Sequence, residues 1–206
     1  MAFQATMKFV IIALLVCSLA DVAARRSKRR KGSAEASGNK RRKPEHTDKE
    51  LDHLECQSPA TADYLLGAEV KILKHGQVTS LNVTKHLGRK VVALYFSARW
   101  CEHSKNLTPL LMKLHKQIGS RNLAIIYVSL NCVTLDRSFS RMEYGLWPFI
   151  SCQDEAAVQL ADHYKIKELP AVVVVNPSGI PIAKYTQKQL LQEEPHRLMK
   201  EWLTIC

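Results

Sequence analysis

The hydrophobic positions of this chain alternate between two periods, which predicts a succession of strands and helices. Continuous apolar runs, typical of strands covered on both faces, occupy residues 91–96, 123–130 and 171–175. Helical spacing of apolar residues predicts helices over 101–118, 135–144, 154–164 and 195–205. A helix between two buried strands forms a right-handed βαβ unit, so the first two runs are expected to pair in parallel.

Weaker patterns flank this unit on both sides. Residues 68–73 and 78–83 each read as a strand, and the turn around Gly76 between them predicts a hairpin. Residues 180–185 read as an edge strand because they carry Pro181. Ordered structure is therefore expected from about residue 63 to the end of the chain, as one domain over 63–206.

The first 24 residues read as a secretory signal peptide. An apolar run at 9–20 follows Lys8, and small residues at Ala20 and Ala24 suit signal peptidase. The run is shorter than the roughly 20 residues that a membrane-spanning helix needs. A short anchor or a core helix is the alternative. The pattern favours a mature protein without a membrane span, secreted or retained in the endoplasmic reticulum lumen.

Residues 25–62 read as a basic, disordered segment or propeptide. Within it, residues 25–50 hold 11 Lys and Arg against 4 Asp and Glu, without hydrophobic periodicity. Three interpretations compete: a furin-type processing site at 26–29, a bipartite nuclear localisation signal, and polyanion binding through residues 25–43. The signal peptide ranks processing or polyanion binding above nuclear import. Nuclear localisation remains the alternative if the N-terminal segment is not a signal.

Candidate chemistry centres on Cys101, at the turn from the 91–96 strand into the 101–118 helix. A helix N-terminus stabilises a thiolate, and the imidazolium of His103 acts in the same direction. The carboxylate of Glu102 opposes it. Ser104 occupies the position where a dithiol enzyme carries its second cysteine. A single thiolate can attack a disulfide, but another thiol must then release the mixed disulfide.

The cysteine count bears on whether Cys101 is free. The chain has six cysteines, and Cys17 leaves with the signal peptide, so an odd number remains in a compartment that permits disulfides. At least one is expected to be free or transiently paired, and Cys101 is the natural candidate.

The other four cysteines allow several pairings. Cys132 follows the 123–130 strand, so it could resolve Cys101 or pair with Cys152. Cys56 and Cys206 flank the domain and could join its ends. A buried free thiol is the alternative for Cys132 and for Cys152, and the connectivity stays open.

Several motifs together resemble the tryparedoxin/nucleoredoxin branch of the thioredoxin-like superfamily. They are YFSARWC at 95–101, LTPLL at 107–111, YVS at 127–129, LWPF at 146–149, YKIKELP at 164–170 and NPSG at 176–179. The resemblance covers roughly residues 68–203. It implies an α/β fold, a thioredoxin-like three-layer α/β/α sandwich with a central mixed sheet and an N-terminal β-hairpin.

The resemblance also implies a client-binding surface. In this fold a cis-proline, here Pro170, faces the active cysteine, and the backbone of Leu169 before it pairs with bound peptide. Trp100 and Trp147 are assigned to the same substrate-binding surface. The chain departs from the family at its dithiol, because the WCPPC motif is replaced by Trp100-Cys101-Glu102-His103-Ser104. This CxxS site also resembles the CxHC of protein disulfide isomerases and the CPHS of anterior gradient proteins.

Two sequons predict a glycoprotein, at Asn82 and at Asn106. A glycan on Asn106 would crowd Cys101. The remaining histidines lack ligand spacing and the chain lacks a phosphate loop, so neither a metal nor a cofactor is expected.

Two functions follow as hypotheses. The first is a secretory-pathway protein that forms mixed disulfides with client proteins through Cys101, in isomerase-like exchange or client retention, with glutathione as a further partner. Monothiol oxidoreductase activity would fit it, and dithiol reductase activity would not. The alternative is a redox-inactive secreted binding or trophic module on a nucleoredoxin-like scaffold. The sequence does not indicate an oligomeric state.

Overall fold

The computed structural model describes residues 56, 61–98, 101–130, 147–185, 187–190, 192 and 194–205. The strands are β1 (Val70–Lys74), β2 (Gln77–Ser80), β3 (Val91–Ser97), β4 (Leu123–Ser129), β5 (Phe149–Ile150), β6 (Ala171–Val175) and β7 (Pro181–Tyr185). The helical elements are the 3-10 turn η2 (Asp63–Leu65), α2 (Val83–Leu87), α3 (Glu102–Ile118), α5 (Glu155–His163), α6 (Gln187–Leu190) and α7 (Pro195–Ile205).

The described strands form one mixed sheet in the order β2-β1-β5-β4-β3-β6-β7. The predicted parallel pair is confirmed, because β3 and β4 run in register from Val91 opposite Leu123 to Ser97 opposite Ser129. β6 lies antiparallel on the other side of β3. β7 is an edge strand, as predicted, and the β1–β2 hairpin forms the opposite edge. The carboxyl ends of β3 and β4 and the start of β6 therefore lie next to one another at the same end of the strands.

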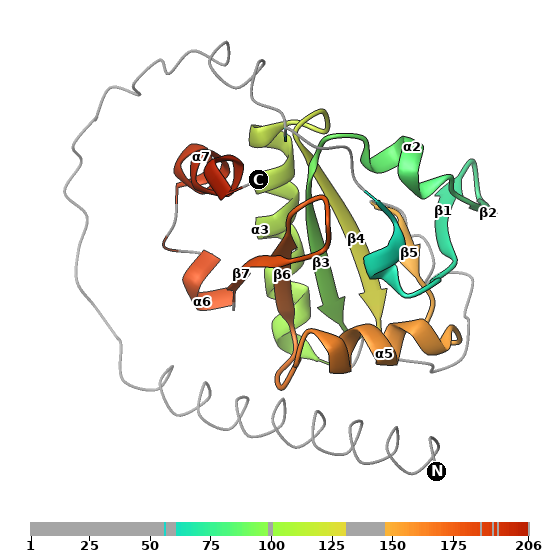
Figure 1. The fold of residues 1–206 in the computed structure, drawn as a ribbon. Helices are drawn as coiled ribbons and strands as arrows, with labels where there is room; N and C mark the ends of the chain where they lie inside the picture. Colours follow the sequence, from blue (N-terminus) through green and yellow to red (C-terminus); the bar gives the residue numbers. More distant parts are fainter. Residues whose placement is uncertain are drawn as a thin grey trace, which may run out of the picture.

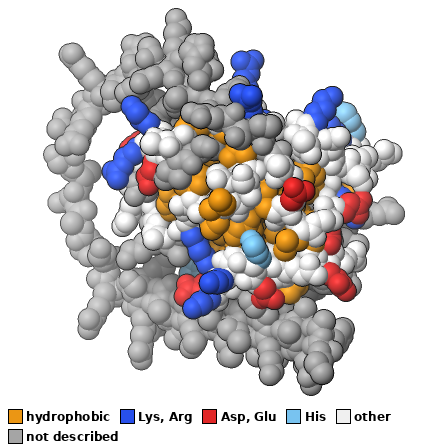
Figure 2. Space-filling view, viewed as in Figure 1, with side chains coloured by type: hydrophobic (Ala, Val, Ile, Leu, Met, Phe, Trp, Pro, Cys, Tyr) orange, Lys and Arg blue, Asp and Glu red, His pale blue; other side chains and the backbone are white. Residues whose placement is uncertain are grey.

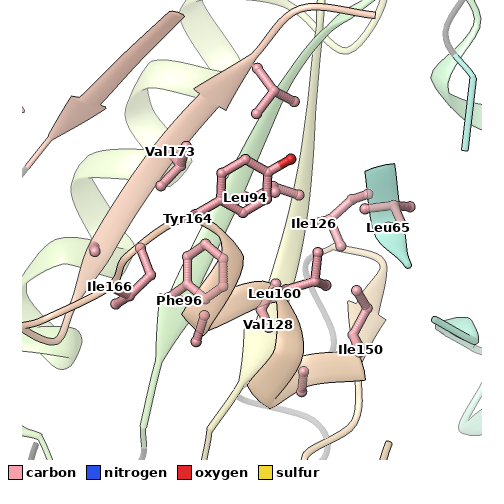
Figure 3. Close-up of a cluster of buried hydrophobic side chains, with 14 of the residues drawn as sticks. Leu65, Leu94, Phe96, Ile126, Val128, Ile150, Leu160, Tyr164, Ile166 and Val173 are labelled. Atoms are coloured by element: carbon pink, nitrogen blue, oxygen red, sulfur yellow. The ribbon is translucent and has the colours of Figure 1, made fainter. Parts of the chain in front are cut away.

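Helices cover both faces of the sheet, which confirms the three-layer architecture (Figure 1). On one face, side chains of η2, α2 and α5 pack against alternate residues of the central strands. Figure 3 shows this cluster around Phe96, Leu94, Ile126 and Tyr164. On the other face, α3 and α7 bury leucines and Trp202 against the intervening residues of the same strands. Because both faces are covered, every residue of β3 and β4 is buried, as their continuous apolar runs predicted.

Local capping explains where the elements begin and end. The strand predicted over 78–83 stops at Ser80 because the side chain of Asn82 accepts a hydrogen bond from the Lys85 N–H and caps α2. Asp154 caps α5 in the same way through the Ala156 N–H. Pro109 lies inside α3, where it removes one backbone donor.

Three short elements escaped the pattern of the sequence, namely η2, β5 and α6. Each has four residues or fewer, which is too short to display a period. The helix predicted over 135–144, the signal peptide and most of the basic segment lie outside the described residues. None of the described helices combines the length and the apolar character that a bilayer crossing requires.

The turn between β6 and β7 is tied to both neighbouring helical elements. Gly179 has a φ of +83°, and a Cβ placed there would overlap Cβ and Cγ of Tyr64 from η2. The Gly179 carbonyl accepts a hydrogen bond of 3.0 Å from the hydroxyl of Tyr164, which follows α5. This close approach requires a residue without a side chain at position 179.

Candidate functional site

Cys101 lies where β3 passes into α3, as predicted. It occupies the N-cap position of α3, and the next residue, Glu102, begins the helix. Two backbone hydrogen bonds shape the turn: the Cys101 N–H donates to the Ala98 carbonyl at 3.1 Å, and the Ser104 N–H donates to the Cys101 carbonyl at 3.0 Å. The sulfur therefore sits at the positive end of a helix of 17 residues.

The Leu169–Pro170 peptide bond is cis, as the resemblance implied. The pairing of Phe96 with Ala171 brings this bond to the carboxyl end of β3. As a result, Sγ of Cys101 lies 3.3 Å from the carbonyl oxygen of Leu169. The structure thus brings together two segments of the predicted site that are far apart in the sequence.

Cys101 itself is a correction to the sequence analysis. It is disulfide-bonded in this structure, and its side chain has no exposed surface. We expected Cys101 to be the cysteine left free by the odd count, and in this state it is not. The structure therefore represents an oxidised form, in which Cys101 cannot attack a disulfide until its own disulfide has been reduced.

Ser104 lies one helical turn beyond Cys101 and is 6% exposed. Among the described residues, its hydroxyl has no hydrogen-bond partner. Its backbone carbonyl, by contrast, accepts hydrogen bonds from the hydroxyls of Tyr95 and Thr108 at 3.1 and 3.0 Å. Sequence reasoning missed both of these supports. A polar ring inside the apolar β3 run and a threonine four residues after Ser104 were the available signals.

The charges around the site largely offset one another. The carboxylate of Glu102 accepts a hydrogen bond of 2.7 Å from Nζ of Lys105. This contact, together with the charges of Lys105 and His103, holds the pKa of Glu102 below its ordinary value. The Lys105 cation therefore weakens the opposition that Glu102 was expected to offer to a Cys101 thiolate. Nε2 of His103 is buried and has no hydrogen-bond partner among the described residues.

Trp147 is a second correction, because it lies in the core and not on a client-binding surface. It is 5% exposed and makes edge-to-face contacts with Tyr95 and His115, with ring centroids 6.3 and 6.5 Å apart. Such burial leaves almost no surface for a client. Trp100, the other tryptophan assigned to substrate binding, lies outside the described residues.

The remaining predicted residues are placed only in part. Cys56 and Cys152 are disulfide-bonded, and Cys56 is buried with its N–H on the Arg89 carbonyl. Cys132 and Cys206 lie outside the described residues, so the predicted pairings stay predictions. Asn82 and Asn106 are both exposed, and their glycosylation also stays a prediction. Within the described ranges, His, Cys, Asp and Glu side chains form no group of three suited to a metal ion.

Comparison with known proteins agrees with this geometry. Residues 88–180 match the family model described as thioredoxin-like. Solved structures with this fold include thioredoxin from Wuchereria bancrofti, at 25% identity and a TM-score of 0.53 over 68% of this chain and 97% of that one. Tryparedoxin from Trypanosoma brucei has 21% identity and a TM-score of 0.53 over 64% of this chain and 90% of that one. The chain therefore carries a thioredoxin-like domain.

Among curated proteins, the relatives are nucleoredoxins and tryparedoxin. Probable nucleoredoxin 1 of Arabidopsis thaliana is 26% identical over 66% of this chain and 24% of its own length. Human nucleoredoxin is 31% identical over 52% of this chain and 25% of its own length. The match thus spans about a quarter of these nucleoredoxins. Tryparedoxin of Trypanosoma brucei brucei is 27% identical over 56% of this chain and 78% of its own length. The thioredoxin-like domain of this chain is thus related to those of the nucleoredoxins and of tryparedoxin.

Proposed function

We propose that this chain is a thiol–disulfide exchange protein of the secretory pathway, which forms mixed disulfides with client proteins through Cys101. The observation that carries the proposal is the position of the Cys101 sulfur, at the N-terminus of α3 and 3.3 Å from the Leu169 carbonyl oxygen. A thiolate released at this helix end is stabilised by the helix dipole and by unpaired N–H groups. The secretory location is supported by the N-terminal sequence pattern alone.

The exchange begins from the oxidised state. A client thiolate attacks Sγ of Cys101, the existing disulfide breaks, and a client–Cys101 disulfide forms. The sulfur formerly bonded to Cys101 leaves as a thiolate and takes up a proton from solvent. A second thiol, from the client or from glutathione, then attacks the mixed disulfide. This step leaves Cys101 reduced and the two attacking thiols joined as a disulfide.

Ser104 shapes how this cycle ends. A dithiol site carries a thiol at this position that releases a mixed disulfide by intramolecular attack, and a hydroxyl does not perform that step. Release therefore depends on another thiol, either the cysteine formerly bonded to Cys101 or an external thiol. Glutathione is the small thiol that we assign to this role. One solved relative of this fold, tryparedoxin II, is in complex with glutathionylspermidine.

The test follows the tryptic peptide 100–105, which holds Cys101 as its single cysteine. The intact chain is incubated with reduced glutathione and, separately, with a reduced cysteine-containing peptide, then quenched with acid and digested. Mass spectrometry of peptide 100–105 should reveal glutathione or the client peptide attached. The control variant Cys152→Ala removes a different disulfide-bonded cysteine, so peptide 100–105 should still be modified in it. If peptide 100–105 never carries either thiol, the proposal is wrong.

A redox-inactive binding module is the second candidate, and the complete burial of Cys101 favours it. In that case the Cys101 disulfide is structural and the thioredoxin-like scaffold serves to bind a partner. Peptide 100–105 would then stay unmodified while the protein remains folded and oxidised. A Cys101→Ala variant would also bind its partner as well as the wild type.

A further inference from the structure

The sequence distributes charge unevenly within the folded domain. Residues 70–135 hold 10 Lys and Arg against one acidic residue, Glu102, whereas residues 136–206 hold 8 against 9. Glu102 is already paired with Lys105 near Cys101. The basic excess of the domain therefore belongs to the first half of the sheet and its helices, where Glu69 and Glu102 pair with Lys71 and Lys105.

The topology gathers much of this charge at one end of the molecule. β3 and β4 start side by side, and the Val91 N–H donates a hydrogen bond to the Asn122 carbonyl. Lys90 comes just before β3 and Arg121 just before β4, so both lie at this end of the sheet. The end of α3, with Lys116, returns to the same place. β1 runs antiparallel to β5, which is parallel to β4, so Lys74 at the end of β1 also lies there.

The short helix α2 completes the basic end. It carries Lys85, and Arg89 follows it in the turn that leads into β3. We define this basic surface as Lys74, Lys85, Arg89, Lys90, Lys116 and Arg121. In Figure 2, Lys, Arg and His side chains lie along the upper margin on the side of α2, while the Asp and Glu side chains on the right lie lower, toward α5.

Two cations of the basic surface, Lys74 and Lys90, lie close enough to His86 to act on its charge. Burial, together with the charges of Lys90, Lys74 and His115, lowers the pKa of His86 on α2. The two salt bridges among the described residues join Lys71 to Glu69 and Lys105 to Glu102, and neither includes a residue of the basic surface. Five of the six basic-surface side chains are exposed, and Lys90 is half-buried. Cations that the fold holds together at the surface, without an acidic partner among the described residues, form a site for a polyanion.

We propose that this basic surface binds a sulfated glycosaminoglycan, at the end of the domain opposite Cys101. α3 has 17 residues, so about 25 Å separates the two sites at a rise of about 1.5 Å per residue. A bound polysaccharide would therefore leave the Cys101 end open to clients. It would hold the protein at the cell surface or in the extracellular matrix.

The surface fits a sulfated polysaccharide better than a nucleic acid. Single-stranded nucleic acids are bound through aromatic side chains on which bases stack. The large hydrophobic side chains exposed in the described part of the chain are Leu66, Val78, Met112 and Ile180, none of them aromatic. A sulfated polysaccharide needs charge alone. The choice of a glycosaminoglycan also rests on the proposed secretory location, since such chains lie outside the cell.

The test uses heparin as the probe and the intact chain, so that the basic N-terminal segment is present in every sample. Lys85→Gln/Arg89→Gln removes two charges from the basic surface. Lys167→Gln/Lys200→Gln removes two exposed charges from other elements and serves as the matched control. We expect the first variant alone to elute from heparin at lower salt. Its slope of log affinity against log salt should fall by about one for each charge removed.

Three results would overturn the proposal. Equal losses in the two variants would mean that binding follows net charge and not the basic surface. Unchanged binding in the first variant would mean that the N-terminal segment alone holds heparin. Tighter binding of a single-stranded oligonucleotide than of heparin at the same salt would overturn the choice of partner. The glutathione modification of peptide 100–105 should be the same in both variants, so a failure here is distinct from a failure of the proposed exchange activity.

Discussion

At the scale of single residues, Ser104 is the position near Cys101 that bears most directly on the proposed exchange. It lies in the first turn of α3, and its N–H donates to the Cys101 carbonyl. Its hydroxyl is buried without a hydrogen-bond partner among the described residues, while Tyr95 and Thr108 hold its carbonyl. Hydrogen bonds therefore hold the backbone of Ser104 in place, while its side chain forms none with the described residues. A thiol placed there would lie where dithiol relatives of this fold carry their second cysteine.

We predict that Ser104→Cys converts the protein into a dithiol reductase. Insulin reduction should rise at least about tenfold above the wild type, which corresponds to about 1.4 kcal/mol in the barrier. The matched control, Ser104→Ala, should stay inactive. The free energy of unfolding of Ser104→Ala should equal that of the wild type or exceed it by up to about 1 kcal/mol, because the substitution removes a buried hydroxyl without a hydrogen-bond partner among the described residues. A correctly folded Ser104→Cys variant that matches the wild type in the insulin assay would contradict this account of position 104.

At the scale of elements, Gly179 in the β6–β7 turn connects this end of the sheet to η2 and to the residue that follows α5. Gly179 is in contact with Tyr64 of η2, and its carbonyl accepts the Tyr164 hydroxyl. This turn comes at the end of β6. At its other end, β6 begins directly after Pro170, next to the Leu169 carbonyl that contacts Cys101. The glycine thus supports the strand that carries one side of the site.

Gly179→Ala is expected to destabilise the protein severely. The new Cβ would overlap Tyr64, and the φ of +83° strains any L side chain, so we expect a loss of about 3 kcal/mol or more. Gly76 offers a matched control, since its φ is +80° and nothing lies within 4 Å of an added Cβ. Gly76→Ala should cost about 1 kcal/mol. Chemical denaturation of the three proteins measures the difference, and equal losses would argue against the Tyr64 contact.

At the scale of the whole molecule, the fold separates two regions of different chemistry. The carboxyl ends of β3 and β4 and the start of β6 hold the Cys101 site, and the opposite end holds the basic surface. Between them, one face of the sheet buries two tyrosines of altered acidity. Burial raises the pKa of Tyr164 to about 12, and burial together with the Tyr164 charge raises the pKa of Tyr64 above its ordinary value.

These tyrosines predict a loss of stability in alkali. Their folded pKa values lie above the unfolded value of about 10, so the folded state favours the neutral phenols. Their stabilising effect is complete below pH 10 and is lost as the pH rises toward 12. Burial lowers the pKa of Lys90 and Lys184, which acts in the opposite sense, but Lys184 is exposed and Lys90 is only half-buried. Melting temperatures from pH 8 to 11.5 should fall above about pH 10, and fall less in Tyr64→Phe/Tyr164→Phe. An equal decline in both proteins would contradict this assignment.

The sequence predicted the regular parts of the fold well, because buried runs and helical spacing report burial directly. The β3–α3–β4 unit, the edge position of β7 and α7 all follow from such patterns. The pattern could not predict β5, because two residues show no period. It could not place Trp147 either, because the burial of that side chain depends on contacts with Tyr95 of β3 and His115 of α3, which are distant in the sequence.

The site was predictable in position but not in state. The order of motifs located Cys101, Leu169 and Pro170, and the structure brings them together. The sequence left cysteine pairing open, because pairing depends on which sulfurs the fold brings within bonding distance. The expectation of a free Cys101 rested on an odd count, and the count cannot tell which cysteine is left over. The disulfide at Cys101 changes the starting point of the proposed chemistry from reduced to oxidised.

The reduction potential of the Cys101 disulfide tests the central claim most directly. The intact protein is equilibrated in glutathione redox buffers, free thiols are alkylated, and the modified fraction of peptide 100–105 is measured by mass spectrometry. An exchange protein of the secretory pathway should be half reduced near the poise of the endoplasmic reticulum, about −180 to −210 mV. A disulfide that stays oxidised until below about −300 mV is structural and would contradict the proposed exchange.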